Sequence, residues 1–247
     1  MDPDEMIFKI HEDLPRQGVG RDRYTRRAYE MLPALDEPRI LDIGCGSGAP
    51  TLELARISGG QVTGVDVHRP YLDDLVRRAE EAGLADRVTA CEGSMLSLDY
   101  PDESFDLAWA EGSIFIVGFD QGLEDWRRLI RPGGFLVVHD VAWLRPDPPS
   151  ELLAFWSEAY PGIRSIPENL AAIPPRGYEV VGHFPLPDDA WWAEFYGPLE
   201  KRLGKLRETY AGNAEALAFI EESEREIEIY RDHPGWYGSV FFLMRKT

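Results

Sequence analysis

The sequence predicts a doubly wound α/β fold, in which helices cover both faces of a mainly parallel sheet. Three observations support this prediction. Strand-like apolar runs alternate with helical patterns from Arg39 to Asp140, a glycine-rich turn joins the first strand to a helix within residues 40–55, and two further strand-like runs follow near the end of the chain. Such alternation is typical of βαβ units around a buried parallel sheet.

The first five strands and the helices between them follow from their residue patterns. Leu72, Leu75, Val76 and Ala79 form an apolar stripe at helical spacing, and Gly83 is suited to end that helix. Pro50 fits the first turn of the preceding helix, where a missing N–H has little effect. The expected strands span 39–44, 61–67, 87–93, 105–113 and 134–140, and the expected helices span 50–58, 70–83 and 121–130.

The last third of the chain differs because its two strands lie far apart in sequence. The runs 177–185 and 235–245 have strand patterns, but about 50 residues separate them where a hairpin loop has roughly two to five. We expect a helical insertion over 186–234. Within it, Pro198 should break or kink the start of the first helix and Asn213 should cap the second.

An amphipathic segment at the start of the chain completes the expected fold. Residues 3–14 have a helical pattern and belong to an expected N-terminal helical cover over 1–34. Together with the insertion, this cover would lie over the carboxyl edge of the sheet, where ligands of open α/β folds bind. We therefore expect one domain over 1–247.

Composition argues against several functional classes. The net charge of −18 repels phosphate backbones, so nucleic acid is not an expected partner. The sequence has no run of about 18 apolar residues, and its start lacks a secretory pattern, so we expect a soluble, cytoplasmic protein without membrane contacts. Cys45 and Cys91 are too few for a disulfide framework or a zinc site. We expect two free thiols and no metal.

The glycine turn predicts a bound ligand, and its pattern alone allows a dinucleotide. Gly44, Gly46 and Ala49 satisfy the G-x-G-x-x-G/A fingerprint. Asp66, at the end of the second strand, suits the acid that binds the ribose in such sites. An NAD(P)-dependent oxidoreductase is therefore one alternative.

The complete turn resembles that of another family. With Gly48 as its third glycine it becomes "DIGCGSG", which is similar to the D-x-G-x-G-x-G signature of the class I S-adenosylmethionine-dependent methyltransferases. The resemblance continues in order through "GVDVHRPYL", "EGSMLSLDYPDESFDLAWA" and "RLIRPGGFLVVHD", and the closing run "GSVFFLMRK" resembles the family's antiparallel last strand. It implies a seven-stranded sheet in the order 3-2-1-4-5-7-6 and S-adenosylmethionine as cofactor. The negative charge of Asp42 also suits this cationic ligand better than a pyrophosphate.

The same resemblance implies a set of cofactor-binding residues. Asp66 would accept hydrogen bonds from both ribose hydroxyls. Ser94 stands where the family often has an acid for the adenine amino group, so this contact is weaker here or moves to Met95 or to a backbone group. The expected cofactor-binding residues are Asp42, Gly44, Cys45, Gly46, Ser47, Gly48, Asp66, Val67, Gly93, Ser94, Met95 and Glu111.

A second resemblance concerns the start of the chain and the end of the fourth strand. The lead-in "LPRQGVG" and the pair "EG" are similar to those of a group of bacterial small-molecule methyltransferases. By that resemblance, Arg16, Gln17 and Gly18 close over the methionine end of the cofactor; the alternative for Arg16 is a solvated loop charge. Nucleobase methyltransferases of this fold have an Asn or Asp, two prolines and an aromatic residue after strand four, which this chain lacks.

Two residues at the carboxyl edge are candidates for catalysis. Glu111 ends the fourth strand, where the methyl group should project, and His139 ends the fifth, although a packed structural histidine is the alternative there. Aromatic residues would form either a wall around an acceptor or the packing face of a lid, namely Phe115, Trp143, Trp191, Trp192, Phe195, Tyr196 and Tyr237. We expect methyl transfer to a small molecule, by a monomer or a homodimer. The alternatives are the oxidoreductase and a non-catalytic S-adenosylmethionine-binding protein.

Overall fold

One mixed sheet contains every strand within residues 3–247, the part of the chain that the computed structural model describes. The strands are β1 (Arg39–Ile43), β2 (Gln61–Asp66), β3 (Val88–Glu92), β4 (Phe105–Glu111), β5 (Ile130–Trp143), β6 (Arg164–Ser165), β7 (Tyr178–Pro185) and β8 (Tyr237–Lys246). They lie in the order β3-β2-β1-β4-β5-β8-β7, with β6 paired to β5. With β6 set aside, the predicted order is confirmed, and so is the antiparallel last strand, because β8 runs antiparallel to both of its neighbours.

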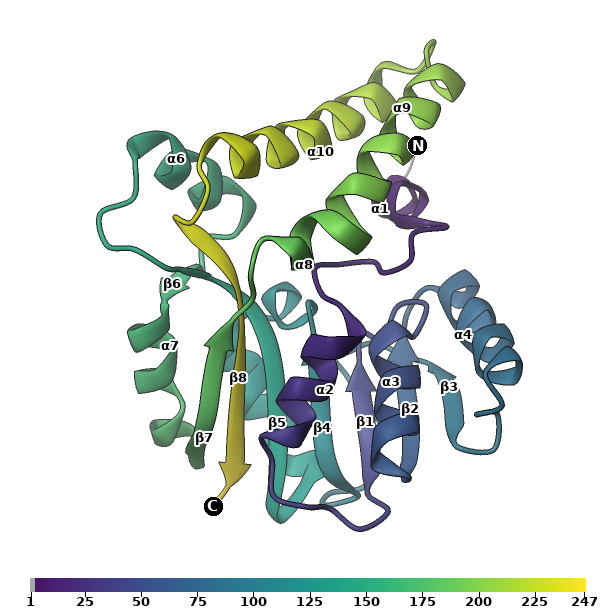
Figure 1. Ribbon diagram of the computed structural model, residues 1–247, viewed down its shortest axis with the longest axis vertical. Helices are drawn as coiled ribbons and strands as arrows, with labels where there is room; N and C mark the ends of the chain where they lie inside the picture. Colours follow the sequence, from purple (N-terminus) through teal and green to yellow (C-terminus); the bar gives the residue numbers. More distant parts are fainter. Residues whose placement is uncertain (1–2) are drawn as a thin grey trace.

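Helices lie on both faces of this sheet and beyond its carboxyl edge (Figure 1). The α-helices are α1 (Pro3–His11), α2 (Asp22–Glu30), α3 (Ala49–Ser58), α4 (Arg69–Glu81), α5 (Phe119–Trp126), α6 (Ser150–Ala159), α7 (Ile166–Ala172), α8 (Asp189–Trp191), α9 (Gly197–Thr209) and α10 (Ala214–Asp232). Three 3₁₀ turns, η1 (Ile114–Ile116), η2 (Arg127–Leu129) and η3 (Pro174–Arg176), and a π-helical turn, η4 (Trp192–Tyr196), connect them. Residues 1 and 2 of the predicted N-terminal cover lie outside the described part.

Strand alternation divides the apolar core into two clusters, one on each face. Ile40 and Leu41 are both fully buried, yet they belong to different clusters, as successive residues of a strand should. Leu52 of α3 and Leu72 of α4 pack into the cluster of Ile40, whereas Leu123 of α5 packs into the cluster of Leu41. The sheet is therefore covered on both faces, which is the predicted doubly wound arrangement.

The segment between β7 and β8 is helical and lies, with α1, beyond the carboxyl ends of β1 and β4 (Figure 1). Asn213 caps α10 as predicted, since its side-chain oxygen accepts a hydrogen bond from the Ala216 N–H at 3.1 Å. The irregularity expected at Pro198 takes the form of η4, in which the Gly197 N–H reaches the Trp192 carbonyl. A Cβ at Gly197 would lie 2.7 Å from that carbonyl oxygen, so only glycine fits there.

Several elements differ from the sequence prediction for identifiable reasons. β5 continues to Trp143 rather than ending at Asp140, because β8 pairs with it as far as Tyr237. The prediction omitted α6, α7 and the two-residue β6. Of these, α7 had a readable start signal, because Ser165 and Glu168 form a capping box. The helix α2 was not separately predicted either, although it lies within the expected cover.

No helix between residues 3 and 247 combines the length and apolar character that crossing a membrane requires.

Candidate functional site

The β1–α3 turn is built on three glycines with positive φ. Gly44, Gly46 and Gly48 have φ angles of 72°, 53° and 83°, in the left-handed region that side chains disfavour. Space is also limited. A Cβ at Gly44 would lie 2.6 Å from the Ser113 Cβ, and one at Gly48 would lie 2.1 Å from Leu75 Cδ1. Both conformation and packing therefore require glycine in this turn.

Asp66 holds the turn from the end of β2. Its Oδ2 accepts a hydrogen bond from the Gly46 N–H and its Oδ1 accepts one from the His68 N–H, each at 2.9 Å. A carboxylate oxygen has more than one acceptor site, so both oxygens of the half-buried Asp66 retain capacity for a ligand donor. The backbone thus fixes this carboxylate beside the glycine turn.

Asp42 lies beneath the same turn. It is 1% exposed, and its Oδ2 accepts a hydrogen bond from the Thr51 hydroxyl of α3 at 2.6 Å. Burial raises the pKa of Asp42 to about 7, although the Thr51 hydrogen bond acts in the opposite direction. The charge of this carboxyl group is therefore sensitive to pH near neutrality.

The loop after β3 is fixed by hydrogen bonds to its neighbours. Gly93 donates its N–H to the Asp66 carbonyl at 3.0 Å, and the Met95 carbonyl accepts from the Trp126 indole at 3.1 Å. The Ser94 hydroxyl accepts a hydrogen bond from a backbone N–H within the loop. Val67 is 54% exposed, so its side chain is on the surface.

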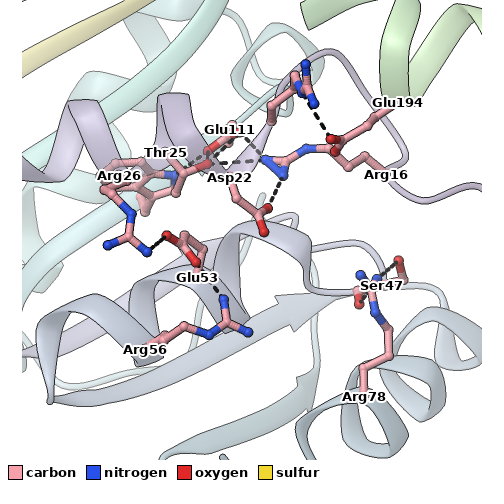
Figure 2. A network of polar contacts seen from close by, with 12 residues as sticks. Arg16, Asp22, Thr25, Arg26, Ser47, Glu53, Arg56, Arg78, Glu111 and Glu194 are labelled. Carbon is pink, nitrogen blue, oxygen red and sulfur yellow. Dashed lines mark hydrogen bonds and ion pairs between the residues drawn. The ribbon is translucent and has the colours of Figure 1, made fainter. Parts of the chain in front are cut away.

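A buried ion pair joins the N-terminal segment to the end of β4 (Figure 2). Arg16 Nη2 lies 2.5 Å from Glu111 Oε1, and Arg16 Nη1 lies 3.1 Å from Asp22 Oδ1. The other Glu111 oxygen, Oε2, accepts hydrogen bonds from the Thr25 hydroxyl at 2.9 Å and from the Trp109 indole at 3.1 Å. Both oxygens of Glu111 are thus engaged.

The burial of this pair decides between the two interpretations of Arg16. The side chains of Arg16 and Glu111 are only 4% and 2% exposed. Burial alone would lower the pKa of Arg16, but the charge and hydrogen bond of Glu111 raise it above its ordinary value. Arg16 is therefore a buried cation paired with Glu111, and the alternative of a solvated loop charge is wrong.

Gln17 connects the N-terminal segment directly to the glycine turn. Its Oε1 accepts hydrogen bonds from both the N–H and the hydroxyl of Ser47, each at 2.8 Å. Arg78 of α4 donates to the Ser47 hydroxyl from the other side, also at 2.8 Å. Cys45 is buried beside this contact, whereas a Cβ at Gly18 would meet no atom within 4 Å.

His139 lies opposite Glu111 in the β4–β5 register. It is 1% exposed and stacks on Phe241 with ring centroids 4.9 Å apart, and neither ring nitrogen has a hydrogen-bond partner among the described residues. Burial, with a smaller contribution from the charge of Arg16, lowers the pKa of His139 to about 3. The imidazole is therefore neutral at pH 7.

The structure brings together most of the predicted site residues and adds others. Gly18 and Val67 are less enclosed than the others, since a Cβ at Gly18 would meet no atom within 4 Å and the Val67 side chain is 54% exposed. Asp22 and Thr25 of α2 and Ser113 were not predicted. Neither α2 residue belongs to a motif. Thr25 is a polar residue on the buried side of an amphipathic helix, which could have indicated it, whereas the side chain of Asp22 is 57% exposed.

The charges around the turn suit a cation. Asp42 and Asp66 lie beside it and form no ion pair within residues 3–247, whereas the charge of Glu111 is compensated by Arg16, and Arg78 is bonded to Ser47. An uncompensated acidic site of this kind fits a sulfonium or ammonium group and disfavours a pyrophosphate. Within residues 3–247, no group of three or more His, Cys, Asp or Glu side chains is arranged to hold a metal ion.

Together, the strand order, the glycine turn after β1 and the acid after β2 define the class I S-adenosylmethionine-dependent methyltransferases. Residues 40–134 match the family described as "Methyltransferase domain". This match runs from β1 to the start of β5, so it contains the glycine turn and Asp66.

Curated relatives and solved structures agree with this assignment. Methyltransferase GfsG of Streptomyces halstedii is 38% identical over 121 residues, which cover 49% of this chain and 44% of the relative. The 27-O-demethylrifamycin SV methyltransferase of Amycolatopsis mediterranei is 35% identical over 124 residues, covering 48% and 44%. These matches thus span less than half of either relative.

The likeness to solved structures extends over almost the whole chain. An S-adenosylmethionine-dependent methyltransferase from Geobacter sulfurreducens, solved with S-adenosyl-L-homocysteine, superposes with a TM-score of 0.84 and 22% identity. The match covers 98% of each chain. At this identity, the likeness supports the fold, including the elements outside residues 40–134.

Proposed function

We propose that this protein transfers a methyl group from S-adenosylmethionine to a small-molecule acceptor. The observation that carries the proposal is the acidic setting of the glycine turn, in which Asp42 and Asp66 lie beside a backbone whose glycines leave no room for a Cβ. Such a site suits a ligand that carries positive charge and ribose hydroxyls.

Individual residues have distinct parts in this proposal. Asp66 would hold the ribose hydroxyls with the acceptor capacity that its two backbone hydrogen bonds leave free. The ionised carboxylate of Asp42 would stabilise the ammonium group of S-adenosylmethionine. Gln17, fixed on Ser47, and Arg16, paired with Glu111, would close the N-terminal segment over the methionine end and exclude water.

The bound cofactor would supply an activated methyl group for an in-line displacement. The protein then has to orient the acceptor, exclude water and, where the acceptor atom is protonated, take up its proton. Glu111 and His139 are the proposed groups for this last task. They lie opposite each other in the sheet, and His139 is neutral, so one of its ring nitrogens is free to accept a hydrogen bond.

The proposed partner class is a small molecule rather than a nucleic acid. The net charge of −18 repels phosphate backbones, and the rifamycin relative is named for a small-molecule substrate.

A cytoplasmic location is supported by the two free cysteines, which suit a reducing compartment. We keep the homodimer as an alternative to a monomer, and sedimentation equilibrium distinguishes the two.

Transfer of a radiolabelled methyl group tests the proposed reaction. The protein is incubated with methyl-labelled S-adenosylmethionine and panels of phenols, quinols, alcohols, thiols and amines. Label in a product, with release of S-adenosylhomocysteine, is the expected result. Tight cofactor binding without transfer to any of these classes would instead favour a non-catalytic binding protein.

Cofactor affinity should depend on pH through Asp42. Because the pKa of Asp42 is raised to about 7, the carboxyl group is largely neutral below that pH and ionised above it. The cationic ligand favours the ionised form, so affinity should rise by up to about tenfold per pH unit as the pH approaches 7 from below. Calorimetry between about pH 6 and 7.5 measures this. Asp42→Asn should remove the rise, and an equal rise in this variant would contradict the role of Asp42.

The N-terminal segment should become less mobile when cofactor binds. Residues 14–20 are anchored by the Arg16–Glu111 pair, the Gln17–Ser47 hydrogen bonds and the Gly20 N–H to the Ala190 carbonyl, all beside the proposed site. Hydrogen–deuterium exchange should slow in this segment and remain unchanged in the distant loop 145–150. Equal exchange in residues 14–20 with and without cofactor would argue against a closing cover.

A further inference from the structure

Three buried aromatic side chains on α6, α8 and β8 carry hydrogen-bond donors that lack a partner among residues 3–247. The donors are the indole Nε1 atoms of Trp156 and Trp191 and the hydroxyl of Tyr237. These side chains are 7%, 2% and 1% exposed, and they come from α6, α8 and β8. Buried donors without partners are rare and unfavourable, so three of them in one place call for an explanation.

The three donors belong to a single aromatic cluster centred on Tyr237. The Tyr237 ring lies 4.9 Å from the Trp156 ring and 6.1 Å from the Trp191 ring, both in edge-to-face arrangements. Trp143 and Tyr230 contact the same ring at 6.2 Å and 5.6 Å. The insertion, α6 and the sheet therefore meet at this cluster.

The cluster lies on the same sheet face as the proposed catalytic groups. Tyr237 pairs with Trp143 across β8 and β5, and His139 precedes Trp143 by an even number of residues on β5, so both side chains point to one face. At a rise of about 3.4 Å per residue, the two positions are about 14 Å apart. The two ring nitrogens of His139 are also without partners among the described residues. This sheet face therefore carries unpaired polar groups both at His139 and at Tyr237.

The chemistry of these groups restricts what they can bind. An indole N–H only donates, a phenol hydroxyl can donate, and the neutral His139 offers one donor and one acceptor. A carboxylate or phosphate ligand would meet the carboxyl group of Glu226, whose charge acts on Tyr237, and Arg16 is already paired with Glu111 and Asp22. Oxygen atoms with lone pairs on a neutral, largely apolar molecule match both the donors and the aromatic surfaces.

We propose that Trp156, Trp191 and Tyr237 form the recognition wall for the methyl acceptor, and that the acceptor is a neutral, largely apolar molecule whose carbonyl, ether or hydroxyl oxygens accept their hydrogen bonds. This inference rests on the proposed methyl transfer. It makes the three residues determinants of acceptor specificity, and it assigns them no part in cofactor binding.

A stability comparison tests, without any acceptor, whether the Tyr237 hydroxyl lacks a partner in the folded protein. Tyr237→Phe removes only the unpartnered hydroxyl, so its melting temperature should equal or exceed that of the wild type. Tyr230→Phe is the matched control from the same cluster, because the Tyr230 hydroxyl donates to Asp188 at 2.9 Å. It should lower the melting temperature by about 2 °C or more. A similar loss in Tyr237→Phe would show a structural partner and overturn the inference.

A transfer assay tests the acceptor class. The neutral probes are a macrocyclic lactone with hydroxyl groups, a hydroquinone and a sterol, and the charged probes are an amino acid and a primary alkylamine. Methylation of a neutral probe is expected, with KM raised about tenfold or more in Tyr237→Phe and kcat nearly unchanged. Methylation of the charged probes alone, or of none of the probes, would overturn the inference. So would an unchanged KM of Tyr237→Phe for the methylated neutral probe.

The affinity for S-adenosylhomocysteine separates this inference from the proposed function. It should be equal in the wild type and in Tyr237→Phe, because the wall is not part of the cofactor site. If the wild type does not bind S-adenosylhomocysteine, methyl transfer itself is refuted. If the wild type binds S-adenosylhomocysteine, but Tyr237→Phe has the same KM values for neutral acceptors as the wild type, only the recognition wall is refuted.

Discussion

Glu111→Gln is expected to reduce turnover by about 10² or more while leaving cofactor affinity nearly unchanged. Glutamine keeps the shape of the side chain but can neither take a proton nor neutralise Arg16, whose Nη2 lies 2.5 Å from the carboxylate. Since the pair is buried, the uncompensated guanidinium should also reduce the free energy of unfolding by roughly 3 kcal/mol. Single-turnover kinetics and urea unfolding measure the two effects separately.

A double variant distinguishes catalysis from structural support. In Arg16→Gln combined with Glu111→Gln, neither buried charge remains, so stability should recover relative to Glu111→Gln alone. If Glu111 acts on the acceptor, turnover should stay low despite the recovery. A change confined to KM would indicate substrate positioning. If Glu111→Gln retains wild-type rate and affinity, Glu111 is a structural acid and His139 becomes the first candidate.

Asp66→Ala is expected to weaken cofactor binding at least tenfold, which corresponds to about 1.4 kcal/mol. The carboxylate is the proposed ribose acceptor, and it also holds the Gly46 and His68 N–H groups at 2.9 Å. Its loss therefore removes ligand contacts and loosens the turn that presents them. Calorimetry with S-adenosylhomocysteine measures the change, and circular dichroism verifies that the variant folds.

Asp102→Ala provides the matched control for the change in charge. Asp102 is 73% exposed and pairs with Arg128, and it is not a member of the proposed site. Its replacement changes the net charge by the same amount as Asp66→Ala, so it should leave cofactor affinity unchanged. Equal affinities of wild type and Asp66→Ala would remove Asp66 from the site.

The sheet could be predicted because local patterns determine it. Residues that alternate between the two cores, such as Ile40 and Leu41, indicate buried strands, and the glycine turn indicates the first crossover. The length of β5 could not be predicted in this way. Its last residues are strand because β8, from the other end of the chain, pairs with them as far as Trp143.

The cofactor side of the site was more predictable than the rest. The motif identified Asp42 and the glycines, because a ligand-binding backbone turn requires particular residues at fixed spacing. By contrast, the engagement of Glu111 by Arg16 and Thr25 depends on how the N-terminal segment folds back onto β4, across about 90 residues of sequence. Local patterns carry no information about such a contact.

Ligand-induced stabilisation tests the central claim most directly. S-adenosylmethionine, S-adenosylhomocysteine and NAD are compared in one thermal-shift series, at concentrations well above the expected dissociation constants. Binding to the glycine turn should raise the melting temperature by roughly 5 °C or more with the first two ligands and leave it unchanged with NAD. A rise with NAD alone would contradict the assignment and favour the oxidoreductase.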